Sequence, residues 1–519
     1  MLRLAEIFQN KMVLQRGIPT RIWGLAAAGE IVSAQIQGRV SEGRADQEGV
    51  FALTIAALKE SAEETLTVKT EHEQIRLEQV AVGEVWIAGG QSNMEFFMEF
   101  ERHVAKEREA CPDADIRFYD VPEVAFAGQR EVFDYSKVGV WRTLTKGDIG
   151  YFSAVGYYFA KHLRTALDVP VGIIGCNWGG TRIASWMDPD SVSRVGQFWI
   201  KEYEKSAAGL DLDVYFEEEK RNPLNDRGSL LENPFYKYMF PTTHTMEENI
   251  AFLSQLGEGP GDYVVRLSPE NIPGSLYEYM VKTIAGYTVR GVLWYQGESD
   301  DEAEGGQYIY GDMLSAMIGD WRSLWNTSLP FLIVQLPGWE RWLANENHDY
   351  AAIRKAQQEV TELVEHTYLC SIGDVGERFD IHPKDKKTVG NRLALLALDH
   401  IYHKPVLSDA PRCISAEWKA GTVVLKFDNT GNVLEIRGGE ISGLVITVKG
   451  EAATYHASVR GDELFLVPDV PAGSRLTISY AQTAWYQINL YNSAEIPALP
   501  FETVCEGRED SGRREEEME

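Results

Sequence analysis

Basic runs, paired cysteines and long apolar segments are missing from this sequence, and each absence excludes a class of protein. Lys and Arg number 50 against 78 Asp and Glu, which gives a formal net charge of −28. A nucleic-acid binder needs a basic face, and no Lys/Arg-rich run supplies one, so we expect no nucleic-acid partner. Binding to anionic membrane surfaces is disfavoured for the same reason. No run of about 18 apolar residues predicts a transmembrane helix.

The cysteines are few and scattered, with no CxxC spacing: Cys111, Cys176, Cys370, Cys413 and Cys505. This pattern fits a reducing compartment, and neither a disulfide framework nor a zinc site. The first residues lack the apolar stretch and the cleavage site of a signal peptide, so we expect a cytoplasmic protein. HExxH, Walker and dinucleotide-binding motifs are also absent. We therefore expect neither a metal nor a cofactor.

The 519 residues exceed what one hydrophobic core holds, so two or three domains are expected. Short apolar runs recur at about ten-residue spacing over residues 1–82, which predicts an N-terminal β domain. Over residues 83–405 strands alternate with helical stretches, which indicates an α/β fold with a mostly parallel sheet and helices on both faces. The catalytic candidates all fall in this second region.

Three further segments complete the organisation. Residues 204–270 are charged and irregular, and we interpret them as an insertion or a lid. The β pattern returns over residues 406–505, with strands predicted at 422–427, 444–448, 463–467 and 475–480. The acidic tail, 506–519, has no apolar run and is expected to be disordered.

The stretch from Val85 to Asn93 organises the rest of the chain. Val85 to Ala88 is typical of a buried strand, and it runs into Gly89-Gly90, where the backbone can turn sharply. Ser92 then stands at the carboxyl end of the strand, where open α/β sheets bind ligands. A serine alone is more often a surface residue or a helix cap, so three later stretches decide between these interpretations.

Two of these stretches also follow apolar strands. Gly179-Gly180 would let backbone N–H groups approach a ligand closely, as an oxyanion hole requires, although a tight turn explains the glycines equally well. Gln296 offers a neutral amide that can donate to a developing oxyanion. Glu298, two residues later, would brace a neighbouring loop or lie exposed.

The last stretch contains Asp380 and His382. A histidine beside an aspartate supplies a general base and the carboxylate that orients it. Residues two apart in an extended segment point to the same side, so Asp380 would need a kink in the loop to reach the imidazole. The alternative is a histidine with only a structural role. Coincidence of all four stretches is improbable, and together they indicate a serine hydrolase.

These motifs resemble those of the sialate O-acetylesterase family of SGNH (GDSL-like) hydrolases, which includes acetylxylan esterase relatives. The resemblance spans roughly residues 7–400, and its matching segments are Met12–Arg16, Ile22–Gly24, Gly83–Trp86, Gly90–Glu95, Trp178–Thr181, Ser185-Trp186, Leu276-Tyr277, Gly291–Ser299 and Asp380–Pro383. It implies a flavodoxin-like three-layer α/β/α catalytic domain flanked by β-sandwich-like domains. The implied activity is removal of acetyl groups from sugar hydroxyls.

The resemblance assigns a role to each catalytic candidate. Ser92 would be the nucleophile, His382 the base and Asp380 its acidic partner. The general SGNH pattern separates the acid and the histidine by three positions, whereas here they are two apart. Asp374 as the acid, or a Ser–His dyad without an acid, therefore stays open.

The resemblance also implies the groups that stabilise the oxyanion. A backbone N–H of Gly179 or Gly180 and the Gln296 amide would join the Ser92 N–H as donors. Removing the Gln296 amide would then cost about 10²–10³ in kcat.

The candidates for substrate contact are Gln91, Trp178, Arg182 and Glu298. Arg182 would pair with a sialate carboxylate or belong to a structural ion pair. Substrates under consideration are 9-O-acetylated sialic acid and acetylated xylo-oligosaccharides. A non-catalytic carbohydrate-binding protein and an esterase acting on non-sugar acyl esters are the alternatives. A homodimer, the commonest assembly, is the expected oligomer if there is one.

Overall fold

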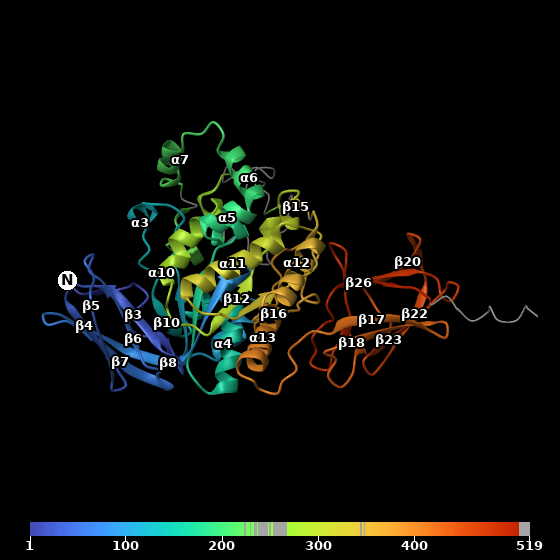
Figure 1. Ribbon diagram of the computed structural model, residues 1–519, viewed down its shortest axis with the longest axis horizontal. Helices are drawn as coiled ribbons and strands as arrows, with labels where there is room; N and C mark the ends of the chain where they lie inside the picture. The colour runs from blue at the N-terminus through green and yellow to red at the C-terminus, as the bar shows by residue number, and fades with distance from the viewer. Residues whose placement is uncertain are drawn as a thin grey trace, which may run out of the picture.

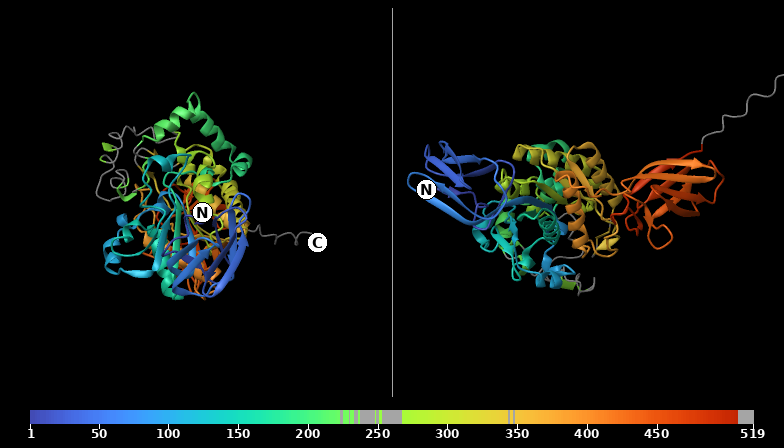
Figure 2. Two further views of the ribbon diagram at one scale, coloured as in Figure 1. Left: turned by 90° about the vertical axis from the view of Figure 1, so that its left-hand side faces the viewer. Right: turned by 90° about the horizontal axis from the view of Figure 1, so that it is seen from below.

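The structure is a computed structural model that describes residues 1–222, 225–228, 230–232, 236, 248, 251–252, 267–342, 345–346 and 348–507. Figures 1 and 2 show the N-terminal strands at one end of a long molecule, helices and strands together in the middle, and the C-terminal strands at the other end. The chain is therefore a mixed α/β protein with several sheets. The tail predicted to be disordered lies, except for its first two residues, outside the described residues.

The middle part contains a central sheet with the strand order β10-β9-β11-β8-β12-β13-β16. These strands are β8 (Gln74–Gly90), β9 (Asp113–Asp120), β10 (Trp141–Leu144), β11 (Val171–Asn177), β12 (Gly291–Tyr295), β13 (Phe331–Val334) and β16 (Thr367–Cys370). All neighbours are parallel except β10, which pairs antiparallel with β9 at one edge. The mostly parallel sheet predicted from the sequence is confirmed.

The sheet contains the flavodoxin-like strand order that the resemblance implied. Numbered along the chain, the five parallel strands β11-β8-β12-β13-β16 follow the order 2-1-3-4-5, which is that of flavodoxin. Strands β9 and β10, which lie in the chain between β8 and helix α4 (Ala154–Leu167), extend the sheet beyond β11. The five-strand order therefore agrees with the expectation, and the sequence did not predict the two added edge strands.

Helices cover both faces of the central sheet (Figure 1). Trp86 of β8 packs against Phe159 of α4 with ring centroids 5.1 Å apart. Trp294 of β12 lies beside Gly89 of β8 and contacts Trp321 of helix α11 (Tyr310–Trp325). Because residues 86 and 89 point to opposite sides of the strand, α4 and α11 lie on opposite faces. Helix α13 (Lys386–Leu396) accompanies α4, and α12 (Tyr350–Leu363) accompanies α11.

The remaining helices are short or lie at the periphery. They are α1 (Ser92–Glu95), η1 (Met98–Phe100), α2 (Val104–Glu109), α3 (Gln129–Val132), η2 (Ile149–Tyr151), η3 (Ile183–Trp186), α5 (Pro189–Val195), α6 (Gln197–Ala207), α7 (Leu212–Glu219), η5 (Leu230–Glu232), η6 (Pro269–Asn271), η7 (Tyr277–Val281), α10 (Lys282–Ile284), η8 (Glu298–Asp301), η9 (Gly306–Tyr308) and η10 (Ala397–Ile401). None of the described helices has the length and apolar composition of a membrane span.

The N-terminal strands form a separate three-stranded sheet and a second group that joins the central sheet through β8. They are β1 (Arg3–Leu4), β2 (Val13–Gln15), β3 (Thr20–Leu25), β4 (Ile31–Ile36), β5 (Arg39–Arg44), β6 (Val50–Ile55) and β7 (Ser61–Lys69). Strand β8 pairs with β7 near its start and with β11 and β12 near its end. The boundary predicted at residue 82 therefore falls inside β8, and the N-terminal strands share one continuous apolar core with the central sheet.

The C-terminal strands have an apolar core of their own. One antiparallel sheet contains β17 (Arg412–Lys419), β18 (Thr422–Asp428), β23 (Glu463–Pro468) and β22 (Tyr455–Arg460). A second contains β21 (Glu451–Ala453), β20 (Leu444–Val448), β24 (Leu476–Tyr480) and β26 (Phe501–Cys505). Two short pairs join β19 (Glu435–Ile436) to β25 (Leu490–Tyr491) and β14 (Arg341–Trp342) to β15 (Asn345–Glu346). The four strands predicted in this region are confirmed, whereas the division of the chain into domains stays a prediction.

The segment predicted as irregular, 204–270, is helical where it begins. It contains the end of α6 and all of α7. Asp211 caps α7, because its side chain accepts hydrogen bonds from the Asp213 and Val214 N–H groups at 3.1 and 3.3 Å. The prediction of irregular structure was wrong here because the many charged residues obscured the apolar periodicity that would have indicated a helix. Most of the segment beyond residue 222 lies outside the described residues, so its interpretation as an insertion or lid stays a prediction.

Candidate active site

Ser92 and His382 meet at the carboxyl edge of the central sheet. Strand β8 ends at Gly90, and α1 begins at Ser92 directly after it. The Ser92 Oγ lies 2.9 Å from the His382 Nε2. Both residues are buried, with exposed fractions of 9% and 6%. The loops after β11 and β12 lie at the same edge because the strands are parallel. The geometry therefore matches a nucleophile beside a general base.

Asp380 lies on the other side of the imidazole. Its Oδ1 is 3.7 Å from the His382 Nδ1 and accepts the His382 backbone N–H at 2.8 Å. The Lys384 Nζ lies 3.0 Å from the Asp380 Oδ2. The loop thus provides the kink that Asp380 needs to approach the ring. Asp374 is instead held by two hydrogen bonds from Arg392, at 2.6 and 2.8 Å.

Burial keeps the His382 imidazole neutral at pH 7. Burial lowers the pKa of His382 to about 4, although Asp380 acts in the opposite direction. Burial by itself would raise the pKa of Asp380, but the hydrogen bond with His382 and the Lys384 charge hold it well below its usual range. A neutral imidazole beside an ionised carboxylate is the state that can accept the Ser92 proton.

Gln296 does not have a free N–H for an oxyanion. Its Nε2 donates to the Thr181 backbone O at 3.0 Å and to the Asp300 Oδ2 at 2.6 Å. These two bonds use both N–H groups of the amide. The predicted role of Gln296 as an oxyanion donor is therefore contradicted. Gln296 instead ties the loop after β11, which contains Thr181, to the end of β12.

The two glycines after β11 differ in what their N–H groups do. The Gly179 N–H donates to the Glu95 Oε2 at 2.5 Å. A Cβ at Gly179 would lie 3.0 Å from that oxygen and 3.1 Å from the Ser92 Cβ, so glycine allows this approach without a shift of either neighbour. Gly180 has a φ of +72° and is exposed, and its N–H makes no hydrogen bond with any described residue. Gly180, together with the Ser92 N–H, fits an oxyanion site better than Gly179.

Asn93, which sequence reasoning did not single out, connects the nucleophile to the histidine loop. Its Nδ2 donates to the Glu298 Oε1 at 2.6 Å and to the Ile381 backbone O at 2.9 Å. The buried Lys386 Nζ donates to the Asn93 Oδ1. Burial raises the pKa of Glu298 to about 7 and lowers that of Lys386 to about 7. The sequence signal that could have identified these residues was their short separation along the chain, Asn93 from Ser92 and Lys386 from His382.

Gln91 and Glu298, the predicted substrate contacts, have buried side chains bonded within the protein, and their contact with substrate stays a prediction. The Gln91 Oε1 accepts the N–H groups of Gly297 and Ser299 at 3.2 and 3.3 Å, which braces the turn after β12. Glu298 holds Asn93 as described above.

Trp178 and Arg182 are likewise packed inside. The Arg182 guanidinium lies 3.4 Å from Glu302 and 4.5 Å over the Trp199 ring. It therefore belongs to an ion pair within the protein, the alternative considered for it, and a contact with a sialate carboxylate stays a prediction. Trp178 lies 4.9 Å beneath the guanidinium of Arg227 and is 4% exposed, so it is not a sugar platform.

Trp342 is a half-buried aromatic residue at the reacting groups. Its ring meets the His382 ring edge-on, with centroids 4.9 Å apart. It comes from the short strand β14 in a loop outside the helices and main sheets. Among 13 tryptophans, no motif distinguished it in the sequence.

Comparison with known proteins gives a consistent set of relatives. The family model for "Carbohydrate esterase, sialic acid-specific acetylesterase" matches residues 261–399. The sialate O-acetylesterase of Mus musculus is 24% identical over 549 residues, which cover 96% of this chain and 94% of the mouse protein. That of Rattus norvegicus is 25% identical and covers 76% of this chain and 72% of its own. A carbohydrate acetylesterase from Xanthomonas citri has a similar structure, with a TM-score of 0.75, 27% identity, and coverage of 97% of this chain and 99% of that one.

Proposed function

The chain belongs to the sialate O-acetylesterase family of carbohydrate esterases, and from that premise we propose that it removes acetyl groups from sugar hydroxyls with Ser92 as its nucleophile. The observation that carries the assignment of Ser92 is its 2.9 Å contact with the His382 Nε2 at the carboxyl edge of the sheet. Arrangement of a serine, a neutral imidazole and a carboxylate in this order supports acyl transfer.

The mechanism follows from the groups around Ser92. The His382 Nε2 takes the Ser92 proton as Oγ attacks the acetyl carbonyl, and the sugar hydroxyl leaves with that proton. Asp380 stabilises the imidazolium that forms. The Ser92 and Gly180 N–H groups stabilise the oxyanion. Water then attacks the acetyl-enzyme, with His382 again acting as base, and acetate is released.

The finer fold class is also a proposal. We infer an SGNH-type catalytic unit with helices on both faces of the sheet and β-sandwich-like units at each end. Three features support this proposal: Ser92 on the helix after β8, Gly179-Gly180 after β11, and the loop with Asp380 and His382 before α13. The cytoplasmic location and the homodimer remain predictions from the sequence.

The choice of sugar is open to a direct experiment. Arg182, the residue predicted to pair with the carboxylate of an anionic sugar, forms an ion pair with Glu302 instead. We expect acetate release from at least one of 9-O-acetyl sialic acid and acetylated xylo-oligosaccharides, measured at equal concentrations by an acetate assay. Release from neither substrate, by a folded protein that hydrolyses 4-nitrophenyl acetate, would leave a non-sugar ester as the substrate. Binding of either sugar without any ester hydrolysis would favour a carbohydrate-binding protein.

We propose Trp342 as the platform on which the sugar ring packs, because its ring is half-buried and contacts the catalytic base. Trp342→Ala should raise the KM for the acetylated sugar about ten-fold, which corresponds to ~1.4 kcal/mol of binding. The KM of the Trp342→Phe variant, which keeps an aromatic ring, should lie between those of the wild type and Trp342→Ala. The KM for 4-nitrophenyl acetate serves as the control, since a small acyl ester makes little use of a sugar platform. An equal effect on both substrates would show that Trp342 acts only by packing against His382.

A further inference from the structure

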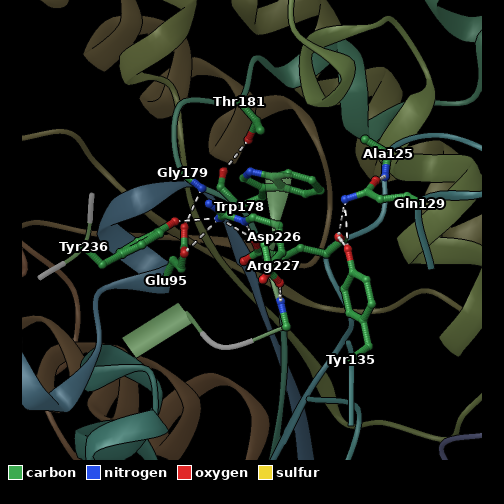
Figure 3. A network of polar contacts seen from close by, with 12 residues as sticks. Glu95, Ala125, Gln129, Tyr135, Trp178, Gly179, Thr181, Asp226, Arg227 and Tyr236 are labelled. Atoms are coloured by element: carbon green, nitrogen blue, oxygen red, sulfur yellow. Dashed lines mark hydrogen bonds and ion pairs between the residues drawn. The ribbon is translucent and has the colours of Figure 1, made fainter. Parts of the chain in front are cut away.

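A buried polar cluster lies directly beneath the glycine loop of the site. Figure 3 shows Glu95, Trp178, Gly179, Arg227 and Tyr236 gathered in one network. Glu95 lies on α1, one turn after Ser92, and is 2% exposed. One of its oxygens accepts the Gly179 N–H, and the other lies 3.4 Å from an Arg227 nitrogen. A single carboxylate thus connects the nucleophile helix, the glycine loop and Arg227.

Arg227 is the cation of this cluster. Its Nε donates to the Glu123 Oε2, and its NH2 donates to the Tyr236 OH at 2.6 Å. Its guanidinium also lies 4.9 Å over the Trp178 ring. Arg227 comes from the segment after α7, which the sequence suggested was an accessory insertion. It therefore contacts both the anchor of the glycine loop and the first residue of that loop.

The charge balance makes the guanidinium essential to the arrangement. Burial raises the pKa of Glu95, Asp120 and Glu123, and for Asp120 the value reaches about 8. Arg227 opposes this rise at all three carboxyl groups. Removing one partner of a buried ion pair leaves the other charge uncompensated, and the structure rearranges or takes up a proton. The Glu95 carboxylate would then lose its fixed position under Gly179.

We propose that Arg227, acting through Glu95, is a positioning residue that holds the Gly179-Gly180 loop where the Gly180 N–H can stabilise the oxyanion. The inference rests on the proposed serine esterase function. Glu95 fixes the peptide group between Trp178 and Gly179 by its hydrogen bond, and this peptide determines the direction of the next N–H. Arg227 then supports the catalytic site from a position distant in sequence from Ser92.

The test uses Arg227→Met, Glu95→Gln and the double variant. With 4-nitrophenyl acetate, Arg227→Met should lower kcat roughly 10–100-fold, because a small displacement of the Gly180 N–H reduces its stabilisation of the transition state. KM should change less than two-fold, since the oxyanion forms only during reaction. Glu95→Gln keeps an acceptor for the Gly179 N–H without a charge. In the double variant, kcat should therefore return to within a few-fold of Glu95→Gln alone.

A second readout does not depend on activity. Amide hydrogen exchange of the peptide 177–183 should become at least ten-fold faster in Arg227→Met and slow again in the double variant. Arg290→Met, which removes an ion pair with Glu84 at the opposite end of the sheet, is the matched control and should leave this exchange unchanged. If Arg227→Met does not fold, Arg227→Lys retains the cation without the two-pronged contact and should show a smaller change of the same kind.

Three results would overturn the inference. The first is an unchanged kcat and exchange rate in folded Arg227→Met. The second is a change in the KM of this variant alone, and the third is a double variant whose kcat is no higher than that of Arg227→Met. A wild-type protein without esterase activity would instead refute the proposed function. The exchange measurement would in that case still decide whether Arg227 positions the loop.

Discussion

Ser92→Ala is expected to abolish acetate release, with a loss of about 10⁶ in kcat. The reason is chemical, because the variant lacks the Ser92 Oγ, which lies 2.9 Å from the His382 Nε2 and is the attacking atom. The remaining donors and binding contacts still stabilise the transition state for attack by water, so a small residual rate is expected. The change removes one buried oxygen and should leave the melting temperature within a few degrees of the wild type.

The measurement is pre-steady-state hydrolysis of 4-nitrophenyl acetate with substrate in excess over enzyme, beside acetate release from the preferred sugar. The wild type should show a burst equal to the enzyme concentration when deacetylation is slow, and the variant should show none. A variant that keeps more than a hundredth of the wild-type rate would place the nucleophile elsewhere. Ser299→Ala is a suitable control, because this buried serine accepts a hydrogen bond from Gln91 at the same edge.

The sequence predicted the position of the site because strand ends are local features. An apolar run that stops at glycine and serine marks the end of β8, and parallel strands bring their carboxyl ends to one edge. Ser92 and His382 lie 290 positions apart, yet each was found beside its own strand or loop signal. The strands of the C-terminal region were predictable for the same reason, since their alternation is visible within six residues.

Side-chain partners across the sheet were not predictable in this way. The amide of Gln296 points to Thr181 and Asp300, and its direction depends on a loop more than a hundred positions away. Arg227 meets Glu95 across a separation of 132 positions, within a segment that the sequence suggested was an insertion or a lid. Burial of these groups follows from the packing of distant segments, which one sequence does not record.

Asp380→Asn carries the second largest expected effect, a loss of about 10⁴ in kcat. A neutral amide neither compensates the imidazolium nor holds the ring in the required tautomer. The pH dependence of kcat/KM gives an independent test of the role of Asp380. Asp380 raises the pKa of His382, while burial lowers it to about 4. The acid limb of kcat/KM should therefore lie near pH 4 in the wild type, since protonated His382 cannot accept the Ser92 proton, and should move to lower pH in the variant.

Asp374→Asn is the matched control that decides which carboxylate is the acid. It breaks the pair with Arg392 and should lower the melting temperature, because a buried guanidinium loses its partner. Its kcat should stay within a few-fold of the wild type. A loss of 10⁴ in Asp374→Asn with little change in Asp380→Asn would reverse the assignment. Small losses in both would mean that Ser92 and His382 act as a dyad, with burial alone setting the basicity of the imidazole.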